Sequence, residues 1–238
     1  MSSIKPLPWY MQVSPIQKKA LFSAWLGYVF DGFDFMLITY ILVSIQQDLQ
    51  LTNVETSSLF MAAFVARPIG GALFGALCDR FGRKPIMMAA ILTYSVGTAL
   101  CGFSVNFASL FIFRLIVGIG MAGEYACSAP YAVESWPKHL RGIAILVSGF
   151  SVGNIAASQL MPIIAEAHSW RVAFFIGIIP ALIVLYIRRH APESEEWKEA
   201  AQSRKISSFS LLNLFKGGQL PVTLIAYVVL FGIFSANW

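Results

Sequence analysis

Long apolar runs alternate with short polar segments along most of the chain. Six of these runs are each close to the ~20 residues that a helix needs to cross a bilayer. They lie at about 21–45, 56–78, 86–105, 108–131, 142–165 and 170–187. A seventh run begins near Leu220 and continues to Trp238, the last residue. The pattern therefore predicts an all-α polytopic membrane protein with a six-helix bundle and the start of a seventh helix.

Composition and charge support this prediction. Of the 238 residues, 57% are hydrophobic and only 12% are charged, whereas a soluble domain has about 25% charged residues. Despite the net charge of +5, a nucleic-acid partner is not expected, because the basic residues fall in loops between apolar runs. The cysteines are irregularly spaced and match no metal or disulfide pattern.

The lysines and arginines of the loops fall almost entirely on one side of the predicted membrane, and the other side has only Arg171. This bias predicts a cytoplasmic amino terminus. The expected organisation is a cytoplasmic tail (1–20), a six-span bundle (21–187), a cytoplasmic linker (188–219) and an incomplete seventh span (220–238).

Charged residues inside the predicted spans are candidates for function, because a buried charge costs at least ~2.5 kcal/mol on insertion scales. Asp31 and Asp34 lie near the middle of the first span, on neighbouring helix faces. The fourth span contains Arg114 and, deeper, Glu124. Arg67 lies near the middle of the second span and can equally be functional or part of a structural pair.

A buried acid can couple proton movement to a change of shape, because burial and a nearby guanidinium act on its protonation in opposite directions. Asp34 is slightly favoured as this proton site because it lies deeper, but Asp31 remains open. Glu124 is a further candidate, which can instead pair with Arg67 or face water. The second span also has a small-residue face, Gly71 and Gly75, suited to close helix contact.

A carboxylate substrate needs a cation and a polar lining. Arg114 is the candidate carboxylate partner, through a bidentate contact. The candidate lining residues are Tyr28 in the first span and, on one face of the fifth span, Ser151, Asn154 and Ser158. Interhelical hydrogen bonding explains the polar residues of the fifth span equally well, so both roles remain open.

The loop after the second span carries the sequence GALCDRFGRKP, from Gly75 to Pro85. Its spacing, G-x3-D-R-x-G-R-K, closely resembles the signature loop of the major facilitator superfamily. RLIVGIGMAGE (114–124) and ESWPKHLR (134–141) match the same family in order and position. PESEEW (192–197) resembles the segment after the sixth span of its sugar and organic-acid porters. The resemblance implies the amino-terminal bundle of a major facilitator fold.

In this family, charged residues at the cytoplasmic helix ends form a network that holds the inward-closed state. Oppositely charged groups at a dry interface suit such a bistable latch. The positions that the resemblance assigns to this gating network are Gly75, Asp79, Arg80, Gly82, Arg83, Glu134, Arg141 and Glu193.

Three longer segments are similar to the sialic acid transporters of this superfamily: SAWLGYVFDGFDF (23–35), GMAGEYACSAPYAVESWPKHLR (120–141) and SGFSVGNIAASQ (148–159). The resemblance implies a symporter of the bacterial inner membrane that carries sialic acid or another carboxylate by alternating access. It implies the proton as coupling ion, with no cofactor and no metal. Such proteins typically pair an acid of the first span with an arginine of the fourth.

The family has two six-span bundles with the site between them, whereas this sequence has one bundle and part of a seventh helix. The expected partners are therefore a carboxylate substrate, membrane lipid and a missing carboxy-terminal bundle. The alternatives are a non-functional fragment, a half-transporter that needs a second chain, and a transporter of another carboxylate metabolite. An enzyme is not expected, because the sequence has no metal-ligand cluster and no nucleophile–base pair.

Overall fold

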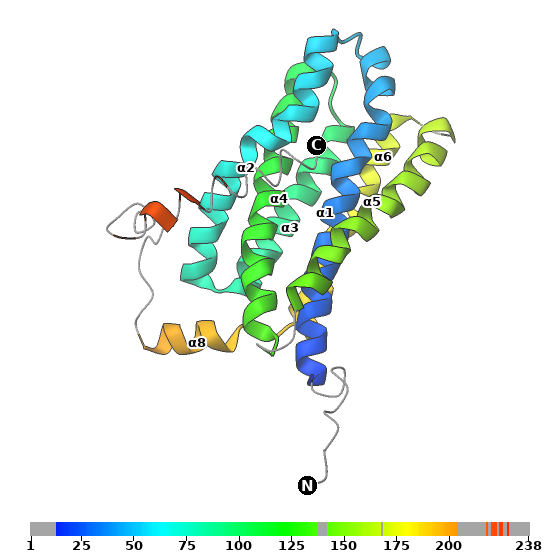
Figure 1. Cartoon of the computed structure of the whole chain (residues 1–238). Helices are drawn as coiled ribbons and strands as arrows, with labels where there is room; N and C mark the ends of the chain where they lie inside the picture. The colour runs from blue at the N-terminus through cyan, green and yellow to red at the C-terminus, as the bar shows by residue number, and fades with distance from the viewer. Residues whose placement is uncertain are drawn as a thin grey trace.

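The computed structural model describes residues 13–137, 142–167, 169–203, 218, 220–222, 224–225 and 228. Within these residues the structure is all helical: α1 (Pro15–Asp48), α2 (Asn53–Phe81), α3 (Arg83–Gly102), α4 (Phe107–Ser135), α5 (Gly142–Ala167), α6 (Trp170–Ile176), α7 (Ile179–His190) and α8 (Glu195–Gln202). The long helices run up and down in one elongated bundle, and α8 lies across one end of it (Figure 1). The predicted all-α bundle is confirmed, while Arg141 and most of the predicted seventh span lie outside the described residues.

Side-chain caps fix where three of the long helices begin. Ser14, Thr52 and Asn106 each accept a hydrogen bond from the backbone N–H of the third residue that follows. The side chain of that third residue interacts in return with the backbone of the capping residue. Because the first N–H groups of a helix have no partner within it, these caps start the helices where polar loops meet apolar runs.

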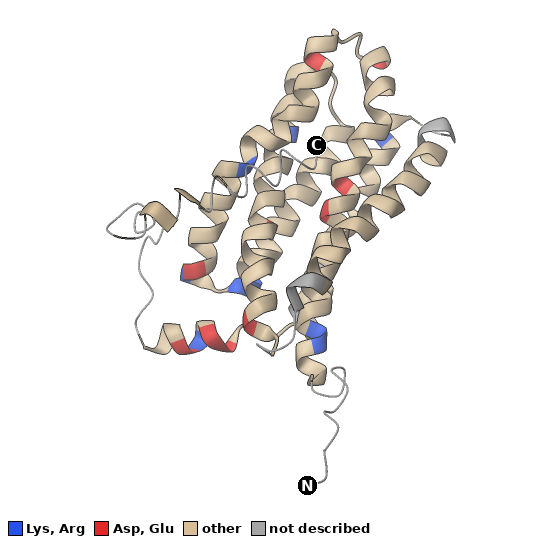
Figure 2. Ribbon diagram, in the orientation of Figure 1, with Lys and Arg blue, Asp and Glu red and all other residues tan. Residues whose placement is uncertain are grey.

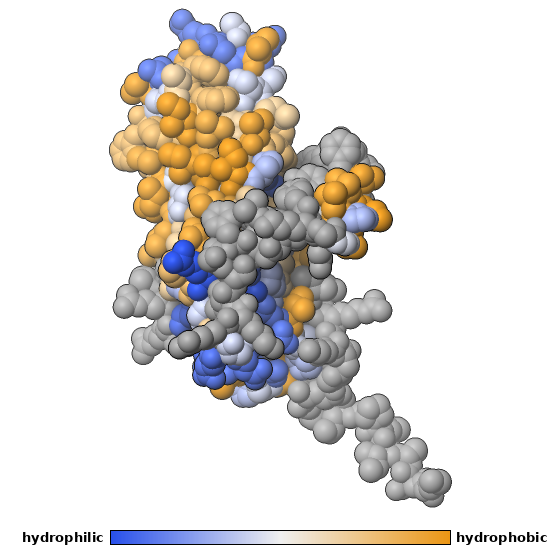
Figure 3. All heavy atoms as spheres, turned by 90° about the vertical axis from the view of Figure 1, so that its left-hand side faces the viewer, coloured by the Kyte–Doolittle hydropathy of each residue, from blue (hydrophilic) through white to orange (hydrophobic). Residues whose placement is uncertain are grey.

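Five helices, α1 to α5, are long and apolar enough to cross a membrane, which agrees with the first five predicted spans. Figure 3 shows one face of the molecule, on which apolar side chains form a broad band between more polar ends.

The sixth predicted span, 170–187, is instead divided into α6 and α7. The N–H groups of Gly177 and Ile178 bond to carbonyls only three residues back, at 3.0 and 3.2 Å. Pro180 has no N–H with which to restore the α-helical pattern, so the helix breaks there.

The closest helix pairs are α1 with α5, α2 with α4, and α3 with α4. Glycine allows this approach: a Cβ on Gly153 of α5 would overlap the Val29 carbonyl of α1. Lipid gives little hydrophobic drive for helices to associate, so close backbone packing of this kind holds a membrane bundle together. α1 and α4 also contact one another, and the charged side chains between them are buried inside the bundle.

The small-residue face of α2 lies at a different position from the one predicted. Nothing lies within 4 Å of a Cβ built on Gly71, and one on Gly75 makes only an ordinary contact, at 3.8 Å, with Ala126. A Cβ on Gly70 would instead overlap the backbone of Ile119 in α4. One residue turns the side-chain direction by about 100° on a helix, so Gly70 makes the close approach to α4, whereas Gly75 only touches it and Gly71 points away.

Candidate functional site

Four charged side chains of α1 and α4 lie buried in the middle of the bundle. Asp31, Asp34, Arg114 and Glu124 are each between 0% and 2% exposed. Figure 2 shows scattered charged residues along the middle of the bundle and a denser group at the end near α8. Burying an ion costs several kcal/mol unless partners compensate it. With the nearby Arg67 of α2, these residues are called the mid-bundle layer below, and their partners define what each can do.

Asp34 and Arg114 face one another between α1 and α4. Arg114 Nη1 lies 3.9 Å from Asp34 Oδ2, within ion-pair range but too far for a direct hydrogen bond. The Thr98 hydroxyl of α3 donates to Asp34 Oδ1 at 2.7 Å. The structure thus brings together the predicted acid and arginine, and adds a residue that sequence reasoning missed. The available signal was a polar group within the third apolar run: Tyr94, Ser95 and Thr98.

Asp31 and Glu124 are less completely satisfied. Asp31 Oδ1 and both Glu124 carboxyl oxygens have no hydrogen-bond partner in the described part of the chain. Glu124 packs directly against α1, because a Cβ on Gly27 would overlap Glu124 Oε1. Electrostatic interactions link Asp31 to Arg67, to Asp34 and to Glu124. A buried carboxyl without a hydrogen-bond donor can hold a proton instead, so these acids are available for proton binding.

Arg67 is the member of this layer that belongs to α2, and it is partly exposed. Its guanidinium lies over the rings of Phe64 and Phe35, at 5.1 and 5.6 Å from their centroids. Its Nη2 is 4.0 Å from the Met121 sulfur, and its Nε has no partner among the described residues. The pair with Glu124 that the sequence left open is therefore not formed, because both carboxyl oxygens of Glu124 are unpartnered.

The predicted lining residues divide into two groups. Tyr28 is 1% exposed and its ring packs on Tyr125 with centroids 4.5 Å apart. Asn154 turns toward α1, and its buried Oδ1 has no partner within the described chain. Ser151 is exposed, and Ser158 hydrogen-bonds within its own helix. Only Tyr28 and Asn154 therefore reach the buried side of their helices, and the described residues show no interhelical bond from either serine.

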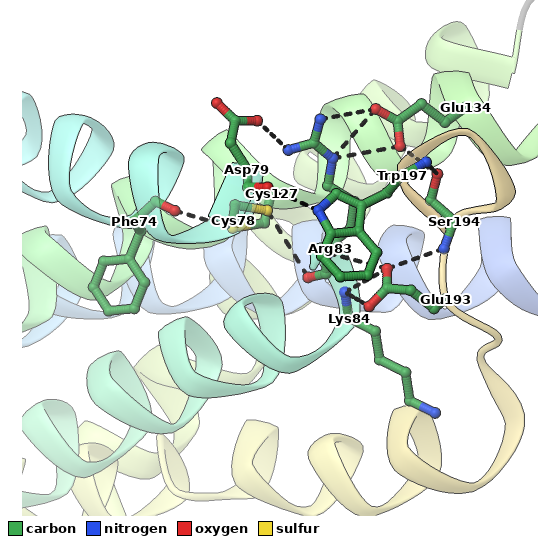
Figure 4. Close-up of polar contacts among 10 residues, drawn as sticks. All are labelled: Phe74, Cys78, Asp79, Arg83, Lys84, Cys127, Glu134, Glu193, Ser194 and Trp197. Carbon is green, nitrogen blue, oxygen red and sulfur yellow. Dashed lines mark hydrogen bonds and ion pairs between the residues drawn. The ribbon is translucent and has the colours of Figure 1, made fainter. Parts of the chain in front are cut away.

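A second group of charges lies at the end of the bundle that carries α8 (Figure 4). Arg83, at the start of α3, donates to Glu134 of α4, with Nη2 2.9 Å from Oε1, and pairs with Asp79 of α2. The Ser194 hydroxyl donates to the other Glu134 oxygen, and Trp197 Nε1 donates to the Asp79 carbonyl at 2.8 Å. Ser194 and Trp197 were missed because nothing in their local sequence indicates their distant partners.

Glu193 connects to this group through backbone rather than through charge. Its Oε1 accepts hydrogen bonds from the N–H groups of Arg83, at 3.0 Å, and Lys84, at 3.2 Å. These are the first N–H groups of α3, so the Glu193 carboxylate caps a helix from about 110 residues away. Gly82 has φ +107°, and a Cβ there would overlap Glu193 Oε2. Glycine is thus required at this turn both for its backbone and for its missing side chain.

Asp79 and the residues bound to it or to its partners form the α8-end network, which comprises Asp79, Arg83, Glu134, Glu193 and Ser194. Two positions that the family resemblance assigned to it make no such contact. Arg80 is exposed and lies over the ring of Phe81 at 5.1 Å, and a Cβ built on Gly75 would meet Ala126 and none of these charged residues. Arg80 directly follows Asp79, so its side chain leaves the helix in another direction.

A family comparison agrees with the fold and the sequence motifs. Residues 24–237 match the family model described as the Major Facilitator Superfamily. The chain therefore belongs to the major facilitator superfamily, a family of transporters that cross the membrane several times. The family predicted from the sequence is confirmed.

Individual relatives show to which transporters the chain is similar. The chain is 56% identical to the sialic acid transporter NanX of Escherichia coli (strain K12), over 97% of this chain and 56% of that protein. It is 38% identical to a probable 4-methylmuconolactone transporter of Cupriavidus pinatubonensis, over 82% of this chain and 47% of that one. The xylose transporter XylE from E. coli, in a partially occluded inward open conformation, aligns with TM-score 0.68 at 25% identity, over 81% of this chain and 52% of that one. The chain thus spans about half the length of the relatives that it matches.

Proposed function

We propose that this chain forms the amino-terminal bundle of a proton-coupled symporter for sialic acid or a related organic acid, in the bacterial inner membrane with its amino terminus in the cytoplasm. The observation that carries the proposal is the buried pair of Asp34 and Arg114, with two incompletely satisfied carboxyls beside it. The 56% identity to a sialic acid transporter supports the substrate. The similarity to a methylmuconolactone transporter favours another organic acid as the second candidate.

The proposed mechanism is alternating access between this bundle and a second six-span bundle. A proton on Asp34 removes its negative charge, so Arg114 loses its attraction to α1 while the Thr98 hydroxyl can stay in place. Loss of that proton restores the pair. Because the pair joins α1 to α4, its two states bias the bundle toward different arrangements. Asp31 and Glu124 are further proton carriers, and no metal or cofactor takes part.

The α8-end network is proposed to act as the latch of the inward-closed state. It ties the ends of α2, α3 and α4 to the segment before α8 through Arg83, Glu134 and Glu193. Charge-assisted hydrogen bonds hold such a latch firmly when it is closed, and bonds to water can replace them when it opens. The transport cycle then uses two groups of charges, one for the proton and one for the conformation.

Expression in a host that lacks sialic acid uptake tests the proposal. The chain is produced alone, and also joined to the carboxy-terminal half of the E. coli relative. We expect the joined protein to accumulate labelled sialic acid only when a proton gradient is present, and the chain alone to accumulate none. Uptake that is indifferent to the gradient would contradict proton coupling. Growth on another organic acid but not on sialic acid would favour the second candidate.

A further inference from the structure

The two arginines of the mid-bundle layer differ in what surrounds them. Arg114 is 2% exposed and faces Asp34 at 3.9 Å, so an anion that bound its Nε and Nη1, which have no hydrogen-bond partner among the described residues, would have to enter a closed space and compete with a carboxylate. Arg67 is partly exposed. Its Nε is unpartnered, and in the described chain its hydrogen-bond partner is the Met121 sulfur. A thioether is a weak acceptor, so the hydrogen-bonding capacity of Arg67 is largely unused.

The surroundings of Arg67 hold its guanidinium without using its donors. Phe64 and Phe35 lie 5.1 and 5.6 Å from it and pack edge to face on each other at 5.5 Å. Cation–π contacts of this kind fix the plane of a guanidinium and leave its N–H edge free. Tyr125 interacts electrostatically with Arg67 and is 41% exposed, so one neighbour of the guanidinium reaches the surface.

We propose that Arg67, and not Arg114, binds the carboxylate of the transported acid. A carboxylate can take two parallel N–H donors from one edge of a guanidinium. The partial exposure, the aromatic support and the unused donors of Arg67 all fit that role. Arg114 then pairs with Asp34, while Arg67, whose charge also acts on Asp31 and Asp34, takes the substrate carboxylate. The inference deepens the proposed function and rests on it, because it names the substrate group that this site recognises.

Equilibrium binding to the purified joined transporter tests this assignment, with sialic acid and its methyl ester as probes. The ester keeps the sugar body and removes the negative charge. We expect Arg67→Gln to weaken sialic acid binding by about 10- to 100-fold, the range of a hydrogen bond to a charged group. Binding of the ester should change less than about threefold, so the preference for the acid is lost. Arg67→Lys should restore part of the preference, since it restores the charge but not the planar fork.

The matched control is Arg171→Gln, which removes an arginine that is paired with Asp48 outside the mid-bundle layer. It should keep the wild-type preference for the acid. The inference is overturned if Arg67→Gln keeps that preference, if it weakens acid and ester equally, or if the wild-type protein does not distinguish them. It is also overturned if Arg114→Gln alone removes the preference. Failure of the proposed function looks different: uptake ignores the proton gradient while the binding preference and its dependence on Arg67 remain.

Discussion

The α8-end network and the mid-bundle layer contain the same kinds of charged side chains but satisfy them to different degrees. At the α8 end, Arg83 donates to two carboxylates, and the Glu193 carboxylate accepts from three backbone N–H groups. In the middle, Asp31 and Glu124 are more deeply buried, yet they keep oxygens without a partner. Satisfied networks stabilise one arrangement, whereas buried unsatisfied groups are costly and are usually retained for function. The charges of the α8-end network thus have partners, whereas several of the mid-bundle charges keep atoms without a hydrogen-bond partner among the described residues.

The largest effect is expected from neutralising the acid that faces Arg114. Asp34→Asn keeps the shape of the side chain but cannot exchange a proton, so it should lower gradient-driven uptake by the joined transporter more than about 100-fold. Counterflow, which needs no net proton movement, should persist. The control is Asp48→Asn, the same change in a residue paired with Arg171 at the far end of α1. Normal uphill uptake by both Asp34→Asn and Asp31→Asn would show that the proton is carried elsewhere.

A large structural effect is expected at the turn of the α8-end network. Gly82→Ala introduces a Cβ at φ +107°, where it would overlap the Glu193 carboxylate that caps α3. The cost should be about 3 kcal/mol in the free energy of unfolding, measured as a lowered thermal transition of the purified protein. Gly71→Ala, with nothing within 4 Å of the new Cβ, should change stability by less than about 1 kcal/mol. Equal stability of the two variants would contradict the role of the Glu193 cap.

An intermediate effect is expected from the pair that joins α3 to α4. In a double-mutant cycle, Arg83→Gln and Glu134→Gln should show a coupling energy of about 1–2 kcal/mol, because the two side chains are only 14% and 13% exposed. The readout is the midpoint of chemical or thermal unfolding. Arg80→Gln in combination with Glu134→Gln should be additive, since Arg80 lies over Phe81 and outside the network. A coupling near zero for the Arg83 pair would mean that it contributes specificity without stability.

The sequence identified the charged positions because a charge stands out in an apolar run and because the motif fixes the spacing of Asp79 and Arg83. It could not identify neutral partners. Phe35 and Phe64, beside Arg67, are indistinguishable in sequence from lipid-facing aromatic residues.

The sequence also could not predict how each helix is rotated or which residues pair over long distances along the chain. The rotation of α2 decides whether Gly70 or Gly71 meets α4, and a 3.6-residue period alone does not fix it in a segment that is apolar all round. Glu193 was assigned to a charge network, yet the groups that it binds include the backbone N–H groups of another helix. Local sequence thus predicts which elements form, while the partners of each side chain depend on packing.

The smallest effect is expected where one neutral hydroxyl supports the proposed proton site. Thr98→Val preserves the shape of the side chain but removes the donor that lies 2.7 Å from Asp34 Oδ1. The loss should be worth about 1 kcal/mol, or roughly fivefold in gradient-driven uptake. Thr93→Val in the same helix removes a hydroxyl that bonds only to the backbone carbonyl of Ala89, so it should leave uptake within about twofold. Because both changes are isosteric and both lie in α3, a difference between them isolates the hydrogen bond to Asp34 from any general loss of helix packing.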